Sequence, residues 1–543
     1  MMSSKSSVPK RHPSGSLLRW VKRQPRGKFP VTILLVAFFF ASISLIWVFR
    51  MPDPITFQRA TQSRSPLDTS ALPSGDRKLA IILPIDRPSP DLCKLIMSAV
   101  ALGYPSPVIV NWQRDFHTDT EGVGASQLAK ITGTLDYLNW ATSKDTPSVD
   151  QLDDDDIIIM LDALDVWFQL PPDVLLNRYF TALQEADQRL QNEHNMTAED
   201  SIHHTIMIAA QKGCFSPRDS VSNFHCKDVP TSILPGDTYG VWTDTKLRSW
   251  RYMRPRYVNS GSIMGPVGDM KRFFGRVQRR MGGYLDGLQD GQELAGDQGV
   301  FEEVFGEQSV WRRRLAQDRL KNDGATENTK TRELQQEYEY HVGLDYRQEL
   351  FYPTCYSEED GFFVELGHPE AVDLESHRAG ISPPRVDGLP ADVAVANPPL
   401  HTLELAASDQ PSWRQLKLYT DFWTTAVPAV IHHNAWKDGL KGRRTTWWDK
   451  MWYFPWLRQL MEHNMVPSND TAPMVEFGAT EEPKLRIWPS DRKWSTREPV
   501  IFGRELAADD WSLYQAEWEY VCRWDPEDKA WHEEIFRDGK GSL

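Results

Sequence analysis

Cysteine is scarce in this sequence: five occur among 543 residues, at positions 93, 214, 226, 355 and 522. Their spacing matches none of the patterns that hold a metal ion, which argues against a cysteine-based metal site. In an oxidising compartment Cys214 and Cys226 form the expected disulfide, because they lie twelve residues apart in one polar loop. The odd number leaves one cysteine over.

The two common glycine-rich phosphate-binding loops are also absent. No G-x-G-x-x-G follows the first expected strand, and no G-x-x-x-x-G-K-[ST] occurs anywhere in the chain. If a nucleotide binds, its phosphate charge must be met in another way. A divalent cation held by carboxylates is the usual alternative.

Acidic residues are absent from positions 1–30, which carry eight lysines and arginines. The whole chain has a formal net charge of −14, so the remaining residues carry −22. Such an acidic body argues against a nucleic-acid-binding surface.

Charge of either sign is missing from positions 29–49, FPVTILLVAFFFASISLIWVF. At about 1.5 Å per residue, a helix of this length spans roughly 30 Å, the thickness of a bilayer core. The run is longer than a signal-peptide core, and no small-x-small cleavage site follows it directly, so we expect a membrane anchor. The basic tail, 1–28, predicts a type II topology with the body in the Golgi or ER lumen, which sequons at Asn195 and Asn469 fit.

Residues 50–76 are polar, rich in Pro and Ser and without period, and they predict a flexible stem. After the stem, short apolar runs alternate with amphipathic stretches. Strands are expected at 78–86 and 106–112, and helices at 91–104 and 125–141. This β-α-β order predicts an α/β domain with a mostly parallel sheet.

A third apolar run, IIIML at 157–161, ends in two carboxylates, Asp162 and Asp165. Its length and β-branched composition predict a strand buried on both faces. In open α/β sheets, ligands bind outside the carboxyl ends of the strands, which is where this D-x-x-D lies. Two neighbouring acids repel one another, so a divalent cation between them is expected. The acids at 153–156 precede the strand and predict a solvated turn at its other end.

Seven segments follow one another along the chain: EGVGASQLAKITGTLDYL, IIIMLDALDVWF, TIMIAAQKGCFSP, RYVNSGSIMGPVGDMKRFF, GDQGVFEEVF, GLDYRQELFYPTCY and PAVIHHNAWK. In this order they resemble the glycosyltransferase domain of procollagen lysyl hydroxylases and its relatives, over roughly residues 78–440. The resemblance implies a GT-A fold, a nucleotide-diphospho-sugar donor, which we expect to be UDP-linked, and Mn²⁺ or Mg²⁺. A fungal Golgi member of that family would fit the expected anchor and stem.

The resemblance implies that Asp162, Asp165 and His432 bind the metal. A neutral imidazole completes an O,O,N ligand set and leaves positions for two phosphates. His433 is adjacent, but alternation along a strand puts the two rings on opposite faces, so only one can serve.

The resemblance also assigns donor contacts. Trp112 would stack on the uracil ring, Lys130 would reach the phosphates, and Lys437 would meet the diphosphate, although its spacing from His432 is one residue short. For Trp112 and Lys130 a plain structural role, core packing or a surface lysine, is the alternative. The implied donor-binding residues are Pro84, Asp86, Trp112, Lys130, Asp162, Leu164, Asn259, Ser260, Gly261 and Lys437.

Asp297 is the expected catalytic or acceptor-orienting carboxylate, with a helix N-cap as the alternative. Leu164 replaces an aromatic residue that the family often has, and Gln211 replaces a glutamate. Insertions at about 216–250 and 357–425 interrupt the expected domain, 77–440, so collagen as the acceptor is not implied. No chemistry is predicted for the Trp-rich extension, 441–543. We expect an amphipathic helix there to pack against the domain.

The chemistry predicted is transfer of a sugar, as by a hexosyltransferase, to a hydroxyl of a glycan or glycoprotein in the secretory pathway. Two other classes stay open. A metal-dependent phosphohydrolase would use the same acids but needs more ligands for a two-metal site. A non-catalytic lumenal protein that binds sugars or nucleotide-sugars would keep the fold without the activity.

The topology can be tested in sealed microsomes. Residues 1–28 should be digested by added protease, whereas residues 50–543 should be protected until detergent opens the membrane. Immunoblotting of tags at the two ends measures both. Digestion of the body without detergent would exclude a lumenal location.

Overall fold

Strand β3, Ile157–Leu161, lies fully buried within a large mixed sheet, as its apolar composition predicts. The computed structural model describes residues 66–543 except 115–124, 195–201, 215–221, 223, 246–249, 289–295, 322–328, 404, 407–408, 436, 438, 467–471, 480–481, 505–509 and 525–529. Residues 64–543 form one compact unit. No helix within the described part is long and apolar enough to cross a membrane, and the expected anchor at 29–49 and both sequons fall outside that part.

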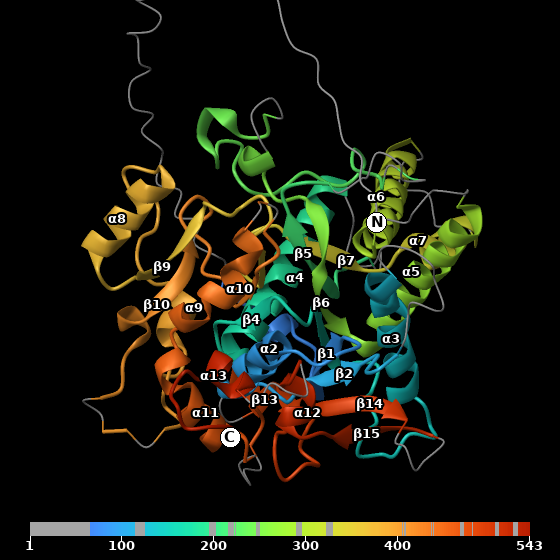
Figure 1. Cartoon of the computed structure of the whole chain (residues 1–543). Coiled ribbons are helices and arrows are strands. Elements are labelled where there is room, and N and C mark those ends of the chain that lie inside the picture. The colour runs from blue at the N-terminus through green and yellow to red at the C-terminus, as the bar shows by residue number, and fades with distance from the viewer. Residues whose placement is uncertain are drawn as a thin grey trace, which may run out of the picture. The chain divides into compact units, whose positions relative to one another are not determined.

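The central sheet confirms the predicted α/β class with a mostly parallel sheet. Its parallel centre is β14-β2-β1-β3, and β6 runs antiparallel between β3 and β5 (Figure 1). The strands are β1 Gly75–Pro84, β2 Val108–Val110, β3, β5 Ile206–Gln211, β6 Tyr257–Pro266, β7 Val342–Asp345, β12 Val475–Ala479, β13 Glu482–Pro489, β14 Val500–Arg504 and β15 Trp511–Gln515.

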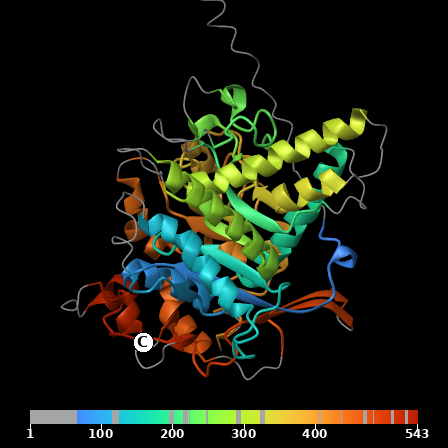
Figure 2. The same ribbon diagram turned by 90° about the vertical axis from the view of Figure 1, so that its right-hand side faces the viewer.

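Alternation along the strands divides the core into two parts. On β1, Leu79 and Ile81 pack into one cluster, and Ala80 and Ile82 pack into the other. Figure 2 faces the layer of helices that covers the second cluster, α3 Ala125–Ala141, α5 Val267–Gly287 and α6 Gln298–Lys321, with α7 Thr329–Tyr338 against α6. The first cluster is covered by α2 Pro90–Ala101, α4 Pro172–His194, α11 Leu457–Asn464, α12 Trp518–Cys522 and α13 Trp531–Ile535.

Several expected boundaries agree with the structure. Helix α3 and strand β3 have the bounds that the sequence predicts. Helix α2 begins at Pro90, after Ser89 caps it by accepting a hydrogen bond from the Asp91 amide. Strand β1 begins earlier, at Gly75, and Leu72 is buried, so the end of the expected stem packs on the body.

The acids before β3 differ from expectation at one position. Asp153, Asp154 and Asp155 are exposed, but Asp156 is buried. Its carboxylate accepts hydrogen bonds from the amides of Lys78 and Asp153, and burial raises its pKa. The prediction of a solvated turn was therefore wrong for Asp156, whose side chain organises the turn from inside.

Two smaller sheets flank the central one. Strands β4 Val166–Phe168, β11 Val430–His432 and β8 Phe351–Pro353 form the first, in that order. The second lies within the insertion at 357–425, where β9 Gly361–Glu365 pairs antiparallel with β10 Lys417–Asp421 beside α8 Pro369–Ala379 and α9 Ala391–Val395.

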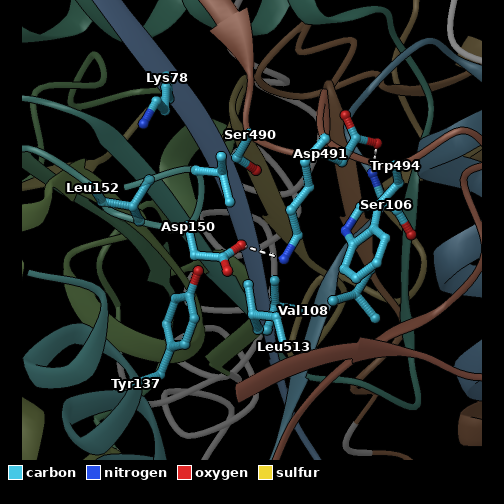
Figure 3. A pocket seen from close by; sticks show the side chains of 13 residues that line it. Lys78, Ser106, Val108, Tyr137, Asp150, Leu152, Ser490, Asp491, Trp494 and Leu513 are labelled. Carbon is cyan, nitrogen blue, oxygen red and sulfur yellow. Dashed lines mark hydrogen bonds and ion pairs between the residues drawn. The ribbon is translucent and has the colours of Figure 1, made fainter. Parts of the chain in front are cut away.

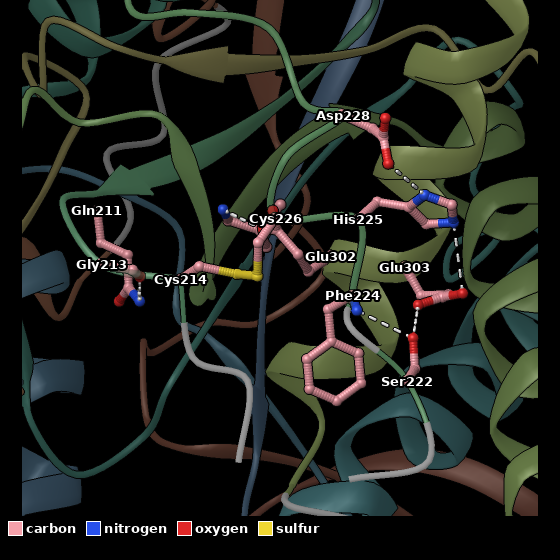
Figure 4. The surroundings of a disulfide bond; sticks show 11 residues. Gln211, Gly213, Cys214, Ser222, Phe224, His225, Cys226, Asp228, Glu302 and Glu303 are labelled. Carbon is pink, nitrogen blue, oxygen red and sulfur yellow. Dashed lines mark hydrogen bonds and ion pairs between the residues drawn. A yellow bond between two sulfur atoms is a disulfide. The ribbon is translucent and has the colours of Figure 1, made fainter. Parts of the chain in front are cut away.

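The expected disulfide between Cys214 and Cys226 is present (Figure 4). The imidazole of the neighbouring His225 contacts the carboxylates of Asp228 and Glu303.

The C-terminal residues are part of the central sheet. Strand β13 pairs with the first half of β1, and β14 pairs with β2, both in parallel. A second disulfide, Cys93–Cys522, joins α2 to α12, and Cys355 remains free and buried. Sequence analysis assigned neither these strands nor this disulfide.

Polar contacts also join the C-terminal residues to the rest of the domain. Asp491 accepts a hydrogen bond of 2.8 Å from the Ser106 amide, and Lys493 forms an ion pair with Asp150 (Figure 3). A cavity of about 20 Å³ lies between them, beside Tyr137, and has room for a single water molecule. The extension therefore fills one edge of the domain.

Truncation tests this integration. A chain ending at residue 440 should not fold, because β1 and β2 lose partner strands and α2 loses the helices that cover it. A chain beginning at residue 64 is the matched control and should melt cooperatively. Circular dichroism during heating separates the two results, and a cooperative transition in the 440-residue chain would contradict the structural role of the extension.

Candidate metal centre and donor site

The pairing of two short strands brings the three expected metal ligands together. The D-x-x-D is the turn from β3 into β4, and the Asp162 amide donates to the Gly261 carbonyl oxygen. Strand β4 pairs antiparallel with β11 so that Val166 lies opposite His432. This register places the imidazole beside Asp165. One ligand atom from each of Asp162, Asp165 and His432 lies within 4.8 Å of the others.

The geometry of this triad fits a divalent cation. His432 Nε2 lies 3.1 Å from Asp165 Oδ1 and 3.5 Å from Asp162 Oδ2. The imidazole is buried, whereas both carboxylates are partly exposed, so a ligand can approach from the side of the acids. Two carboxylate oxygens and one imidazole nitrogen are a donor set that Mn²⁺ accepts, with positions left for further oxygen ligands.

A chain of amide contacts fixes which imidazole nitrogen faces the acids. The Gly261 amide can only donate, so the atom of Asn259 that it contacts at 3.2 Å is the carbonyl oxygen. His432 Nδ1 lies 3.1 Å from that same oxygen and must donate to it. Nε2 is then left to the carboxylates, and in the neutral ring it carries the lone pair that a metal requires.

Charges within the triad influence one another. Burial would lower the pKa of His432, but the carboxylates of Asp165 and Asp162 raise it. Burial would likewise raise the pKa of Asp165, but His432 holds it at about 2. Carboxylate and imidazole therefore favour each other's charged form, and a bound cation would compete with a proton for His432.

His433 is excluded as the ligand. It is fully buried on the other side of β11, where its ring lies 4.1 Å from the Trp167 ring. Burial lowers its pKa to about 3, so the imidazole is neutral. Neither ring nitrogen has a hydrogen-bond partner among the residues that the structure describes.

Gly261 leaves the space in which the triad assembles. A Cβ atom at this position would lie 2.2 Å from His432 Cε1 and 2.7 Å from Asp162 Oδ2. Both distances are shorter than any normal contact. Glycine is therefore required on β6 by close approach of two ligands, and the expected small-residue turn is here a strand residue.

Lys130 connects the triad with Asp297. Its ammonium group lies 2.5 Å from Asp162 Oδ1 and 2.7 Å from Asp297 Oδ2, and 3.5 Å from the Ser260 carbonyl oxygen. Burial opposes the charge on Lys130, but the two carboxylates raise its pKa above the ordinary value. Asp297, itself buried just before α6, therefore faces the site.

The residues expected around the base lie at the ends of β1 and β2. Pro84 ends β1, and the Asp86 carbonyl oxygen accepts a 3.0 Å hydrogen bond from the Gln113 amide. Trp112 is only 8% exposed and packs in the core, with its ring against Tyr520. Trp112 therefore has little free surface for a base.

Two other residues that were expected to contact the donor, Leu164 and Lys437, make contacts elsewhere. Leu164, inside the D-x-x-D, is half-buried against the core. Lys437 is half-exposed and forms an ion pair with Glu359. The structure thus brings Lys130, Asn259, Ser260 and Gly261 to the triad but joins Lys437 to the insertion.

Other residues contribute without a motif that would reveal them. Gln211 donates to the Gly213 carbonyl oxygen and accepts a 2.9 Å hydrogen bond from Asn259 Nδ2, which orients the amide below His432. Arg444, on α10 Arg443–Thr446, helps to lower the pKa of Asp165. Arg444 belongs to the C-terminal extension, where sequence analysis expected no chemistry.

Comparison with known proteins assigns no family. No protein-family model matches the chain, and no curated protein matches it significantly.

Adding one methyl group at position 261 tests whether the metal binds at the triad. Gly261→Ala should weaken Mn²⁺ binding by roughly tenfold or more, since changes around metal ligands cost about 10–100-fold. Gly503→Ala, in β14, is the matched control, because a Cβ there would first meet an atom at 3.4 Å. Titration calorimetry with Mn²⁺ measures both, and equal affinities would mean that the metal does not bind at the triad.

Proposed function

We propose that the protein is a metal-dependent glycosyltransferase with a GT-A-like fold that takes its sugar from a nucleotide-diphospho-sugar. The observation that carries the proposal is the Asp162-Asp165-His432 triad at the carboxyl end of a buried parallel strand. Nucleotides bind at this edge of α/β sheets, and a metal there replaces the missing glycine-rich phosphate loop.

Asp162, Asp165 and His432 would hold Mn²⁺ or Mg²⁺. The bound cation supplies charge neutralisation for the diphosphate leaving group. Asn259 binds His432 Nδ1 and so leaves Nε2 facing the acids, and Gly261 leaves room for His432 and Asp162 to lie close together. Both features support this ligand set. Arg444, which forms an ion pair with Asp91, lies close enough to Asp165 to help lower its pKa.

Lys130 and Asp297 are the next parts of the mechanism. Lys130 is charged and has two carboxylate partners, so it can exchange one of them for a phosphate oxygen without leaving its position. Asp297 forms a 2.7 Å ion pair with Lys130, a position that suits a carboxylate that orients, or accepts a proton from, the acceptor hydroxyl. We propose that the acceptor is a hydroxyl group of a glycan or glycoprotein.

A phosphohydrolase is the weaker alternative. Two-metal hydrolysis requires a second set of acid and histidine ligands. Within the described residues, the triad is the one group of three such side chains close enough to share a metal ion. A non-catalytic sugar-binding protein would in turn have no need for Asp297 beside the metal site.

The secretory location remains part of the proposal. Two disulfides fit an oxidising lumen. The insertion at 357–425 folds as a two-stranded sheet with helices, and its Glu359 forms an ion pair with Lys437, five residues after His432; such an insertion suits recognition of an acceptor.

The decisive experiment removes one charge at a time. Asp162→Asn and Asp165→Asn should each lower Mn²⁺-dependent turnover of a UDP-sugar by roughly 100-fold or more, because losing a ligand should cost more than the roughly 10–100-fold effect of changing a residue that only orients a ligand. The variants should stay folded, since Asn preserves the shape of the side chain.

Asp153→Asn is the matched control, because Asp153 is exposed at the other end of β3. It should leave both turnover and melting temperature unchanged. Equal turnover in all three variants would exclude the triad as the metal centre. Cleavage of the UDP-sugar by water to UMP and sugar 1-phosphate, without sugar transfer to any hydroxyl, water included, would favour the phosphohydrolase.

A further inference from the structure

The C-terminal helix α12 lies at the carboxyl ends of β1 and β2, the edge where the proposed nucleotide would bind. The Ser89 amide donates a 2.9 Å hydrogen bond to the Val521 carbonyl oxygen, which fixes α12 to the loop after β1. The Cys93–Cys522 disulfide fixes it a second time. This part of the chain is therefore held in place, although it lies about 400 residues from β1.

Helix α12 presents an open aromatic ring at this edge. Tyr520 is 45% exposed, whereas Trp112, against which it packs, is 8% exposed. Their ring centroids are 5.5 Å apart and their planes are tilted by 60°, so no base can enter between them. The ring of Tyr520 is thus the accessible aromatic surface of the pair, and Trp112 supports it from below.

The supporting residues beneath Tyr520 are closed to a ligand and fixed. The indole Nε1 of Trp112 is buried, so this edge of the Trp112 ring is closed to a ligand. The loops after β1 and β2 are joined by the hydrogen bond from the Gln113 amide to Asp86. The aromatic pair therefore stands on a fixed base rather than on separate loops.

We propose that the ring of Tyr520 is the platform on which the nucleotide base of the donor stacks. The proposal rests on the proposed function and adds a residue from outside the segment that carries the glycosyltransferase resemblance. Aromatic rings bind bases through their faces, and the hydroxyl group is not needed for this contact. The C-terminal extension would then complete the donor site.

Calorimetric titration with UDP in the presence of Mn²⁺ tests the platform. Tyr520→Ala should bind UDP roughly tenfold more weakly, the scale of one lost base–aromatic stack, whereas Tyr520→Phe should bind as the wild type does. Inorganic pyrophosphate, which has no base, should bind equally to all three proteins. Trp242→Ala is the matched control, because Trp242 is similarly exposed, at 40%, and lies in η3, Gly240–Trp242.

The outcomes separate this proposal from the proposed function. If the wild type binds UDP and Tyr520→Ala binds it equally well, Tyr520 is only a cover for Trp112, and the platform is excluded. A parallel loss of pyrophosphate binding in Tyr520→Ala would mean that the metal site was disturbed, which also overturns the platform. If the wild type binds neither UDP nor pyrophosphate, the proposed function itself fails, and the platform fails with it.

Discussion

The structure of the site depends on the need of three neighbouring carboxylates for positive partners. Asp162, Asp165 and Asp297 converge near the end of β3, where their negative charges would repel one another and the buried Asp297 would be costly if it were alone. Lys130 lies between two of them and His432 beside the third. The balance is local, because every charge has an opposite charge within hydrogen-bonding distance.

Other features of the site follow from this balance. The imidazole can face the acids only if its other nitrogen is occupied, and Asn259 occupies it. Asn259 is oriented in turn by Gln211 and by the Gly261 amide. Gly261 itself has no side chain, which allows the ligands to approach. Gln211 and Asn259 are thus polar because each orients the next side chain toward the ligands, and Gly261 is small because two ligands need the space.

The sequence was informative where the signal is local. Apolar length and β-branching predict β3, and its end predicts the place of Asp162 and Asp165. Alternation along a strand allows only one of two adjacent histidines to face the acids, and the structure places His432 beside them. The Lys130–Asp297 contact joins residues 167 positions apart and depends on how α3 and α6 pack, which no local pattern encodes. For the same reason, the strands in the C-terminal extension and the Cys93–Cys522 disulfide were not predicted, since a partner strand gives no sign in its own residues of where it will pair.

The pairing of β1 with β13 has a consequence for synthesis of the protein. Asp76 and Arg486 form an ion pair across these strands, and 410 positions separate them in the chain. At about 5–20 residues per second, a ribosome needs roughly 20–80 s to cover that interval. Throughout it, the first strands of the domain have emerged while one edge of the sheet has no partner, and such edges associate with other chains. The early part of the domain is therefore open to association with other chains until its last strands arrive, and this is the interval in which a chaperone would protect it.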